Sequence, residues 1–190
     1  MSQKPETKAI RLQTKRTDQK EHSTPLFLTS SFVYDNAEEM AAAFADDSLK
    51  VNIYSRFSNP TVDEFVEKIA ALENAEDGIA TGTGMAAVFS TFMTFLSKGD
   101  HIISASAIFG STHTILTKYL PKWGIEYSYF NMNEPEAIEK LIRPNTRMLF
   151  VETPSNPGLD IIDIEYVAQL CKTHNILFVV DNCFATPAVQ

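Results

Sequence analysis

Short apolar segments alternate with helical segments from residue 78 onward, and this alternation limits the fold more than any other feature of the sequence. The apolar segments have the length of β-strands and lie at 78–81, 101–105, 125–130, 147–151 and 176–180. The gaps between them carry helical patterns at 85–96, 112–120, 134–142 and 164–174. Because repeated strand–helix–strand units form parallel pairs, the sequence predicts an α/β fold with a mainly parallel sheet covered by helices on both faces.

Two regions need separate interpretation. Residues 1–35 are polar and non-periodic as far as Pro25, which predicts an extended arm. A short helix is expected at 38–44, an extended aromatic segment at 51–57, and another helix where Asn59-Pro60 begins a run with helical spacing. The helix at 85–96 is apolar on almost every side, so we expect it to be buried on more than one side within a larger assembly.

Charge and composition exclude several classes of protein. The chain carries 16 basic and 24 acidic side chains, a formal charge of −8, which disfavours nucleic acid as a partner. No apolar run approaches the roughly 20 residues of a membrane helix, and the polar N-terminus does not resemble a secretory signal. The two cysteines, Cys171 and Cys183, lack paired spacing, which favours a reduced cytoplasmic location and, for Cys183, simple packing. The four histidines form no ligand pattern, so we expect no metal site.

A glycine-rich run, Thr81–Ala87, follows an expected strand and begins an expected helix. Glycine lets a ligand approach the backbone closely, and free N–H groups at a helix N-terminus attract an anion, so a phosphate fits here. A tight turn without a ligand is the alternative. The run also matches a dinucleotide fingerprint, which requires an acidic residue after the second strand. This chain has Ser106 there, and Asp100 lies at the opposite end of the strand, which argues against a dinucleotide.

Four further features lie in the 51–57 segment or at strand ends, where ligands of parallel sheets collect. In an extended segment Tyr54 and Arg56 point to one side and could grip a phosphate, or they could stack at the surface. Phe109 could stack on a planar cofactor or pack in the core, and Asn156, between two prolines, could face a ligand or cap its turn. Asp181 ends a buried strand, where a carboxylate needs a cation such as a protonated heteroaromatic nitrogen.

Together these residues resemble the cystathionine γ-synthase family, the pyridoxal-phosphate (PLP) enzymes of cysteine and methionine metabolism. The resemblance runs from about Pro25 to the end of the chain, and within the family it is strongest to the O-succinylhomoserine sulfhydrylases. It rests on five ordered motifs: Tyr54–Thr61, Thr83–Ala87, Phe109–Thr112, Glu152–Pro157 and Asp181–Pro187.

The resemblance implies a PLP-dependent, aspartate-aminotransferase-like (fold type I) large domain, here truncated, and a role for each site residue. Residues 1–58 would be an arm with a cofactor-binding, intersubunit segment, and residues 59–190 part of the large domain. The backbone of Gly84 and Met85 would hold the phosphate, with Tyr54 and Arg56 reaching it from a neighbouring subunit of a homodimer or homotetramer. Asp181 would pair with the pyridine nitrogen, Asn156 would bind the ring hydroxyl, and Phe109 would stack on the ring.

The chain departs from the family in two ways. Many members have Tyr where this chain has Phe109, so a proton transfer through that hydroxyl cannot operate here. The Schiff-base lysine lies in the family some twenty residues past the Asp181 position, beyond Gln190, and none of the eleven lysines present has its Ser-x-x-Lys setting. The sequence thus resembles roughly the N-terminal half of an enzyme, carries no catalytic residue of its own, and is expected to be inactive alone.

For a complete enzyme the resemblance implies γ-replacement on an O-acylhomoserine, O-succinylhomoserine first, with sulfide to give homocysteine in methionine biosynthesis. Cystathionine γ-synthase, cystathionine β-lyase and methionine γ-lyase activities are alternatives of the same class. A non-catalytic truncated paralogue is the alternative of another class.

Overall fold

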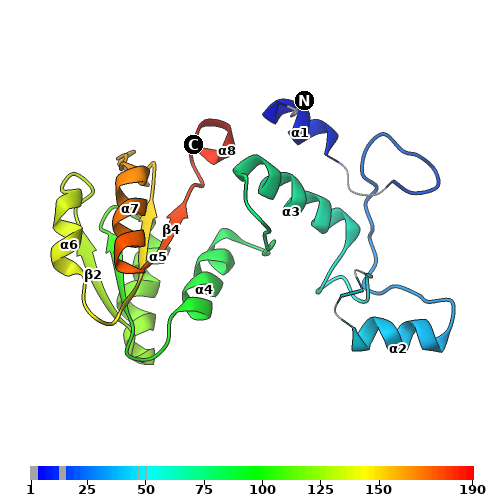
Figure 1. Ribbon diagram of the computed structural model, residues 1–190, viewed down its shortest axis with the longest axis horizontal. Coiled ribbons are helices and arrows are strands. Elements are labelled where there is room, and N and C mark those ends of the chain that lie inside the picture. The colour runs from blue at the N-terminus through cyan, green and yellow to red at the C-terminus, as the bar shows by residue number, and fades with distance from the viewer. Residues whose placement is uncertain (1–3, 13–15, 47, 50) are drawn as a thin grey trace. The chain divides into compact units, whose positions relative to one another are not determined.

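The computed structural model describes residues 4–12, 16–46, 48–49 and 51–190. The chain forms two compact units, Met1–Ala80 and Thr81–Gln190, and each is described by itself (Figure 1). The sequence predicts a division between residues 58 and 59 instead, between an arm and a large domain. The units divide later because the helix that follows Asn59 packs within the first unit, against the helix near the N-terminus. An arm and a large domain that meet at residue 58 of a whole protein stay a prediction.

The first unit consists of helices joined by extended segments. Its helices are α1 Pro5–Arg11, α2 Ala37–Ala45 and α3 Pro60–Glu73. Asn36 and Asn59 cap α2 and α3, because their side chains accept hydrogen bonds from the N–H groups of Glu39 and Thr61 at 2.7 and 3.0 Å. The helices expected at 38–44 and after Asn59 are thereby confirmed.

The expectation of an extended arm over residues 1–35 is wrong at α1. Pro5 stands at the first helical position, Glu6 lies in the first turn and Arg11 in the last, which suits the helix dipole. Packing beside α3 then stabilises a segment whose sequence shows no apolar periodicity. Residues 1–3 and 13–15 of the expected arm lie outside the described residues.

The second unit contains the parallel sheet that the sequence predicts. Its strands are β1 His101–Ala105, β2 Glu126–Phe130, β3 Thr146–Glu152 and β4 Leu177–Asp181, in the order β2-β1-β3-β4 and all parallel. The strand expected at 78–81 is wrong, because no described strand pairs with this segment and Ile79 is 92% exposed. An apolar run does not form a strand without a partner edge.

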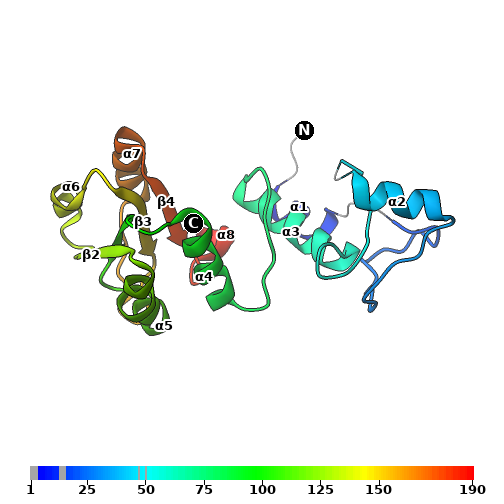
Figure 2. The same ribbon diagram turned by 90° about the horizontal axis from the view of Figure 1, so that it is seen from below.

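Helices cover both faces of this sheet, since α5 and α7 lie on opposite sides of it (Figure 2). The helices expected at 85–96 and 164–174 are present as α4 and α7. The segments expected at 112–120 and 134–142 are divided into shorter helical pieces. The first segment changes to π-helical bonding at Ile115, where the N–H of Leu120 bonds to the carbonyl of Ile115, and Pro121 has no N–H to continue that bonding. The elements are α4 Gly84–Phe95, α5 Gly110–Thr114, the π-helix η1 Ile115–Tyr119, the 3₁₀-helices η2 Leu120–Trp123 and η3 Pro135–Ala137, α6 Ile138–Leu141, α7 Ile164–His174 and α8 Thr186–Val189.

The core lies between the sheet and these helices. Phe92 of α4 meets Phe150 of β3 edge to face, with ring centroids 5.2 Å apart, and α7 contributes Val167 and Cys171. Of the twelve residues of α4, all of them described, Phe92 alone is buried. In the chain by itself only one side of the helix is covered, so its burial on more than one side within a larger assembly stays a prediction.

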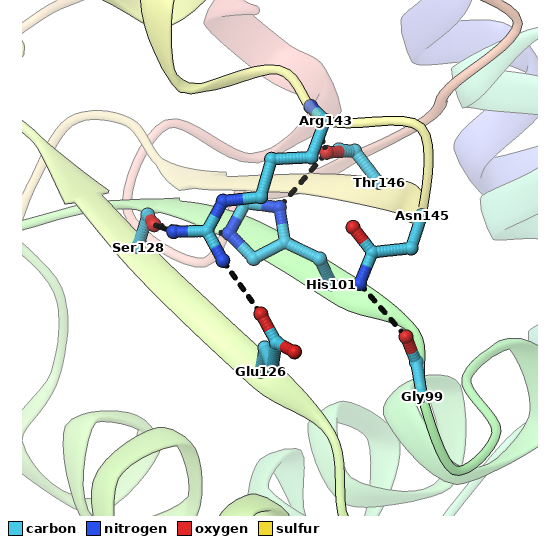
Figure 3. A network of polar contacts seen from close by, with 7 residues as sticks. All are labelled: Gly99, His101, Glu126, Ser128, Arg143, Asn145 and Thr146. Atoms are coloured by element: carbon cyan, nitrogen blue, oxygen red, sulfur yellow. Dashed lines mark hydrogen bonds and ion pairs between the residues drawn. The ribbon is translucent and has the colours of Figure 1, made fainter.

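A polar network joins three strands at the amino-terminal edge of the sheet (Figure 3). The imidazole of His101 is completely buried and bonds to the hydroxyls of Thr146 at 2.8 Å and Ser128 at 2.9 Å. Arg143 adds a bond from its side chain to Ser128 and one from its backbone N–H to Thr146. These contacts fix the register of β1 against β2 and β3. The register in turn determines where each strand ends at the opposite, carboxyl edge of the sheet.

Within the described part of the chain, no helix is long and apolar enough to cross a membrane. The same residues contain no group of three or more His, Cys, Asp or Glu side chains placed to hold a metal ion.

Candidate cofactor site

The candidate site lies at the carboxyl edge of the sheet in the second unit. The chain passes from β1 outward to β2 and then crosses back to β3 on the other side of β1, so the direction of winding switches between β1 and β3. Ligands of open parallel sheets bind at the carboxyl ends of strands beside such a switch. The residues that follow β1, β3 and β4 are those that the sequence singles out.

The N-terminus of α4 also faces this edge. The short connection of residues 96–100 joins the end of α4 to the start of β1. The helix is therefore antiparallel to the strands, and its N-terminus lies at their carboxyl ends (Figure 1). Thr83 caps the helix by accepting a hydrogen bond from the N–H of Ala86 at 3.0 Å. Among the described residues the N–H groups of Gly84 and Met85 have no acceptor.

Gly84 leaves this helix end open. Its φ is not in the left-handed region, so the backbone conformation does not require glycine there. A Cβ built at Gly84 would meet nothing within 4 Å. An unobstructed helix end with two free donors and no acidic side chain in its first turn suits a dianionic phosphate.

Phe109 and Asn156 are brought together by a residue that the sequence reasoning did not select. The carboxylate of Glu152 ends β3 and is 4% exposed. It accepts a hydrogen bond from the backbone N–H of Phe109 at 2.6 Å, and the backbone of Asn156 has a weaker influence that lowers the pKa of the same carboxylate. The ring of Phe109 is 43% exposed, which leaves it available for stacking. Of its two interpretations, core packing is therefore the weaker.

The loop that carries Asn156 is closed by its own hydrogen bonds. Ser155 is completely buried, and its hydroxyl donates to the carboxylate of Asp160 at 2.9 Å while accepting from the N–H of Asp160 at 3.0 Å. A Cβ at Gly158 would lie 2.6 Å from Oδ2 of Asp160, so a larger residue there would displace the carboxylate that closes the loop. Among the described residues the side-chain amide of Asn156 makes no hydrogen bond, so turn capping does not occupy it.

Asp181 lies beside Glu152 as its partner across the β3–β4 ladder. Its Oδ1 accepts a hydrogen bond from the N–H of Cys183 at 3.1 Å, and its side chain is half-buried. Burial raises the pKa of Glu152, the N–H bond from Phe109 lowers it, and the negative charge of Asp181 raises it further. Two carboxylates at one edge make the site attractive to a cationic group.

Tyr54 and Arg56 belong to the first unit, and a turn of the chain brings their side chains close together. Tyr54 forms an isolated antiparallel bridge with Ser31, and the N–H of Phe57 then bonds to the carbonyl of Tyr54 at 2.8 Å. The expectation of an extended segment throughout 51–57 is wrong at 55–57. The guanidinium of Arg56 nevertheless lies over the rings of Tyr54 and Phe57, at 5.3 and 5.1 Å from their centroids.

The residues of the second unit fit a phosphate-bearing aromatic cofactor such as PLP. The open helix end offers unpaired donors for the phosphate, Phe109 offers an exposed ring face, and Asp181 offers a carboxylate for a protonated ring nitrogen. Glu152 could have been found from the sequence by the reasoning applied to Asp181, because it too is a carboxylate at the end of a buried strand.

Comparison with known proteins agrees with this fit. The family model of the Cys/Met metabolism PLP-dependent enzymes matches residues 6–190. An O-succinylhomoserine sulfhydrylase of Pseudomonas aeruginosa is 43% identical over 185 residues, which cover 97% of this chain and 46% of that protein. An L-methionine gamma-lyase of Fusobacterium nucleatum is 38% identical over 167 residues, which cover 87% of this chain and 42% of that protein.

The fold has a similar counterpart among solved structures. A putative O-acetylhomoserine (thiol)-lyase of Campylobacter jejuni, which contains N'-pyridoxyl-lysine-5'-monophosphate, matches with a TM-score of 0.91 and 34% identity. The match covers 98% of this chain and 46% of that structure. The chain therefore spans about half the length of the relatives it matches.

Proposed function

The chain belongs to the Cys/Met metabolism PLP-dependent enzymes, and within that family we propose that it forms roughly the N-terminal half of an O-succinylhomoserine sulfhydrylase. The reaction replaces the γ-succinyloxy group of O-succinylhomoserine with sulfide, giving homocysteine and succinate. The observation that carries the proposal is the joint placement of an open helix N-terminus, an exposed aromatic ring and a carboxylate at one sheet edge. The 43% identity to a sulfhydrylase supports this substrate over others.

Each residue has a role in holding the cofactor. The backbone N–H groups of Gly84 and Met85 bind the phosphate, and the ring of Phe109 stacks on the pyridine. Asp181 keeps the pyridine nitrogen protonated, and the amide of Asn156 binds the ring hydroxyl. PLP when bound supplies an electron sink for carbanions next to the amino group of the substrate.

The chain lacks one group that this chemistry needs. We place the Schiff-base lysine beyond Gln190, so the 190 residues alone carry no base for moving protons at the substrate and have no turnover. Phe109 has no hydroxyl, so its ring contributes stacking and no proton transfer.

The active site is proposed to be completed by a second subunit. Tyr54 and Arg56 bind the phosphate of the neighbouring copy, and the exposed apolar side chains of α4 support a homodimer or homotetramer. We place the enzyme in the cytoplasm, consistent with two free cysteines, one of them exposed. Gel filtration of the whole protein should give at least twice the subunit mass.

Methionine γ-lyase activity is the second candidate, because a lyase of this kind is 38% identical to the chain. The two activities differ in the fate of the substrate once the γ-substituent has left. A sulfhydrylase adds sulfide and retains the four-carbon amino acid, whereas a lyase releases ammonia and a 2-oxo acid.

The test is a product assay of the whole protein loaded with PLP. O-succinylhomoserine is supplied with sulfide, with cysteine, or with neither, and O-acetylhomoserine and methionine are assayed in parallel. Homocysteine formation that requires sulfide and prefers the succinyl ester supports the proposal. Cystathionine from the cysteine reaction identifies a cystathionine γ-synthase, and 2-oxobutanoate from methionine identifies the lyase. No product from any mixture supports the non-catalytic paralogue.

A further inference from the structure

We propose that Glu152 is a positioning residue for the cofactor, whose carboxylate fixes the backbone that carries both the ring of Phe109 and the amide of Asn156. This inference rests on the roles that the proposed function gives to those two residues.

The geometry places one carboxylate between two separate loops. The N–H of Phe109, which donates to the carboxylate at 2.6 Å, comes from the segment that joins β1 to α5. The backbone of Asn156, which lowers the pKa of Glu152, lies in the loop after β3. Glu152 itself ends β3, whose central residues are all buried. The end of a rigid strand therefore binds one loop directly and interacts with the other, and among the described residues no other hydrogen bond joins the two loops.

A glutamate suits this position better than its amide. A carboxylate has acceptor oxygens only, so both N–H donors find an acceptor in any orientation of the group. Glutamine would offer one oxygen and one NH₂, and the NH₂ would face a donor if each loop met a different atom. The distance of 2.6 Å from the N–H of Phe109 is that of a charge-assisted bond.

The neighbouring charge gives Glu152 a second effect. Asp181 is its partner across the strand ladder. In this partly buried site the charge of Asp181 makes ionisation of Glu152 less favourable, which raises the pKa of Glu152. A cation on the pyridine nitrogen relieves that cost, so removal of the Glu152 charge should weaken retention of the protonated cofactor as well as loosen the two loops.

The experiment compares Glu152→Gln with Glu64→Gln in the whole protein with PLP. Glu64 is a matched control, since it is also a buried glutamate, 5% exposed, but it lies in α3 and pairs with Lys68 at 2.8 Å. The readouts are the dissociation constant of PLP and the visible circular dichroism of the bound cofactor, measured per mole bound. The thermal midpoint of the cofactor-free protein reports folding separately.

Glu152→Gln should weaken PLP about tenfold, which corresponds to about 1.4 kcal/mol, the size of one charge-assisted hydrogen bond. It should also reduce the dichroism per bound cofactor, because the ring is held less rigidly, while Glu64→Gln leaves both values within about twofold. Equal affinity and dichroism in Glu152→Gln and the wild type would overturn the proposal, as would equal losses in both variants.

If the Glu152→Gln protein does not fold, a measurement on the wild type tests the proposal instead. Hydrogen exchange of the wild type without PLP should show the amides of Phe109 and Asn156 protected, and exchange at the unprotected rate would overturn the proposal. If the wild type itself binds no PLP, the proposed function fails, and that result is distinct from unchanged binding in the variant.

Discussion

Replacement of His101 by Leu should destabilise the second unit by about 2 kcal/mol through loss of two buried hydrogen bonds. The imidazole bonds to Thr146 at 2.8 Å and to Ser128 at 2.9 Å and is completely excluded from solvent. Both hydroxyls keep a bond donated by Arg143, but a neutral imidazole accepts from one of them, and that hydroxyl loses the acceptor of its proton. Leu has nearly the volume of His, so cavity formation adds little.

The assay is urea unfolding of the 190-residue chain at about pH 7.5, followed by far-UV circular dichroism. With a slope of about 2 kcal/mol per molar urea, the midpoint should fall by about 1 M while the slope stays constant. A loss below about 0.5 kcal/mol would show that these buried bonds contribute nothing, because surface substitutions produce changes of that size.

The same residue predicts a pH dependence. Burial lowers the pKa of His101, the positive charge of Arg143 lowers it further, and the negative charge of Glu126 raises it. Since the folded state then takes up the proton less readily than the unfolded state, wild-type stability should fall as the pH decreases from about 6.5 toward the lowered value. The Leu variant should lack this part of the pH profile.

Three further predictions concern the site and its surroundings. Thr83→Ala removes the cap of α4 and should cost about 1 kcal/mol, measured by urea unfolding, with faster hydrogen exchange confined to the first turn of the helix. Gly158→Ala brings a Cβ to 2.6 Å from Oδ2 of Asp160 and should break the bond that closes the loop, at about 1 kcal/mol by the same assay. Burial raises the pKa of Cys171 to about 11, so a thiol reagent at about pH 8 should modify exposed Cys183 first and Cys171 only on unfolding.

The α/β class, the four strands of the sheet and the long helices could be predicted, because each depends on a local apolar period. The strand expected at 78–81 is absent for a reason outside its sequence, since a strand needs a partner edge that no local pattern reports. Helix α1 was missed for the opposite reason, because packing beside α3 stabilises a segment without apolar periodicity.

The residues proposed for the site at strand ends could be selected from the sequence because parallel sheets bring their ligands there, and their roles stay predictions. The strand-end rule could also have selected Glu152, but its bond to the backbone N–H of Phe109 could not be predicted, because a sequence shows side chains and not the donors they meet. The turn at 55–57 was missed because Ser-Arg-Phe carries no glycine or proline to mark it.

In the proposed function this chain supplies residues that bind PLP in a longer enzyme, and the lysine that forms the Schiff base with PLP lies outside residues 1–190. The decisive measurement is borohydride reduction of the whole protein with PLP, followed by digestion and mass mapping of the pyridoxyl group. We expect a single pyridoxyl-lysine in a peptide outside residues 1–190. A pyridoxyl group on one of the eleven lysines of this chain, or on none at all, would show that the proposal is wrong.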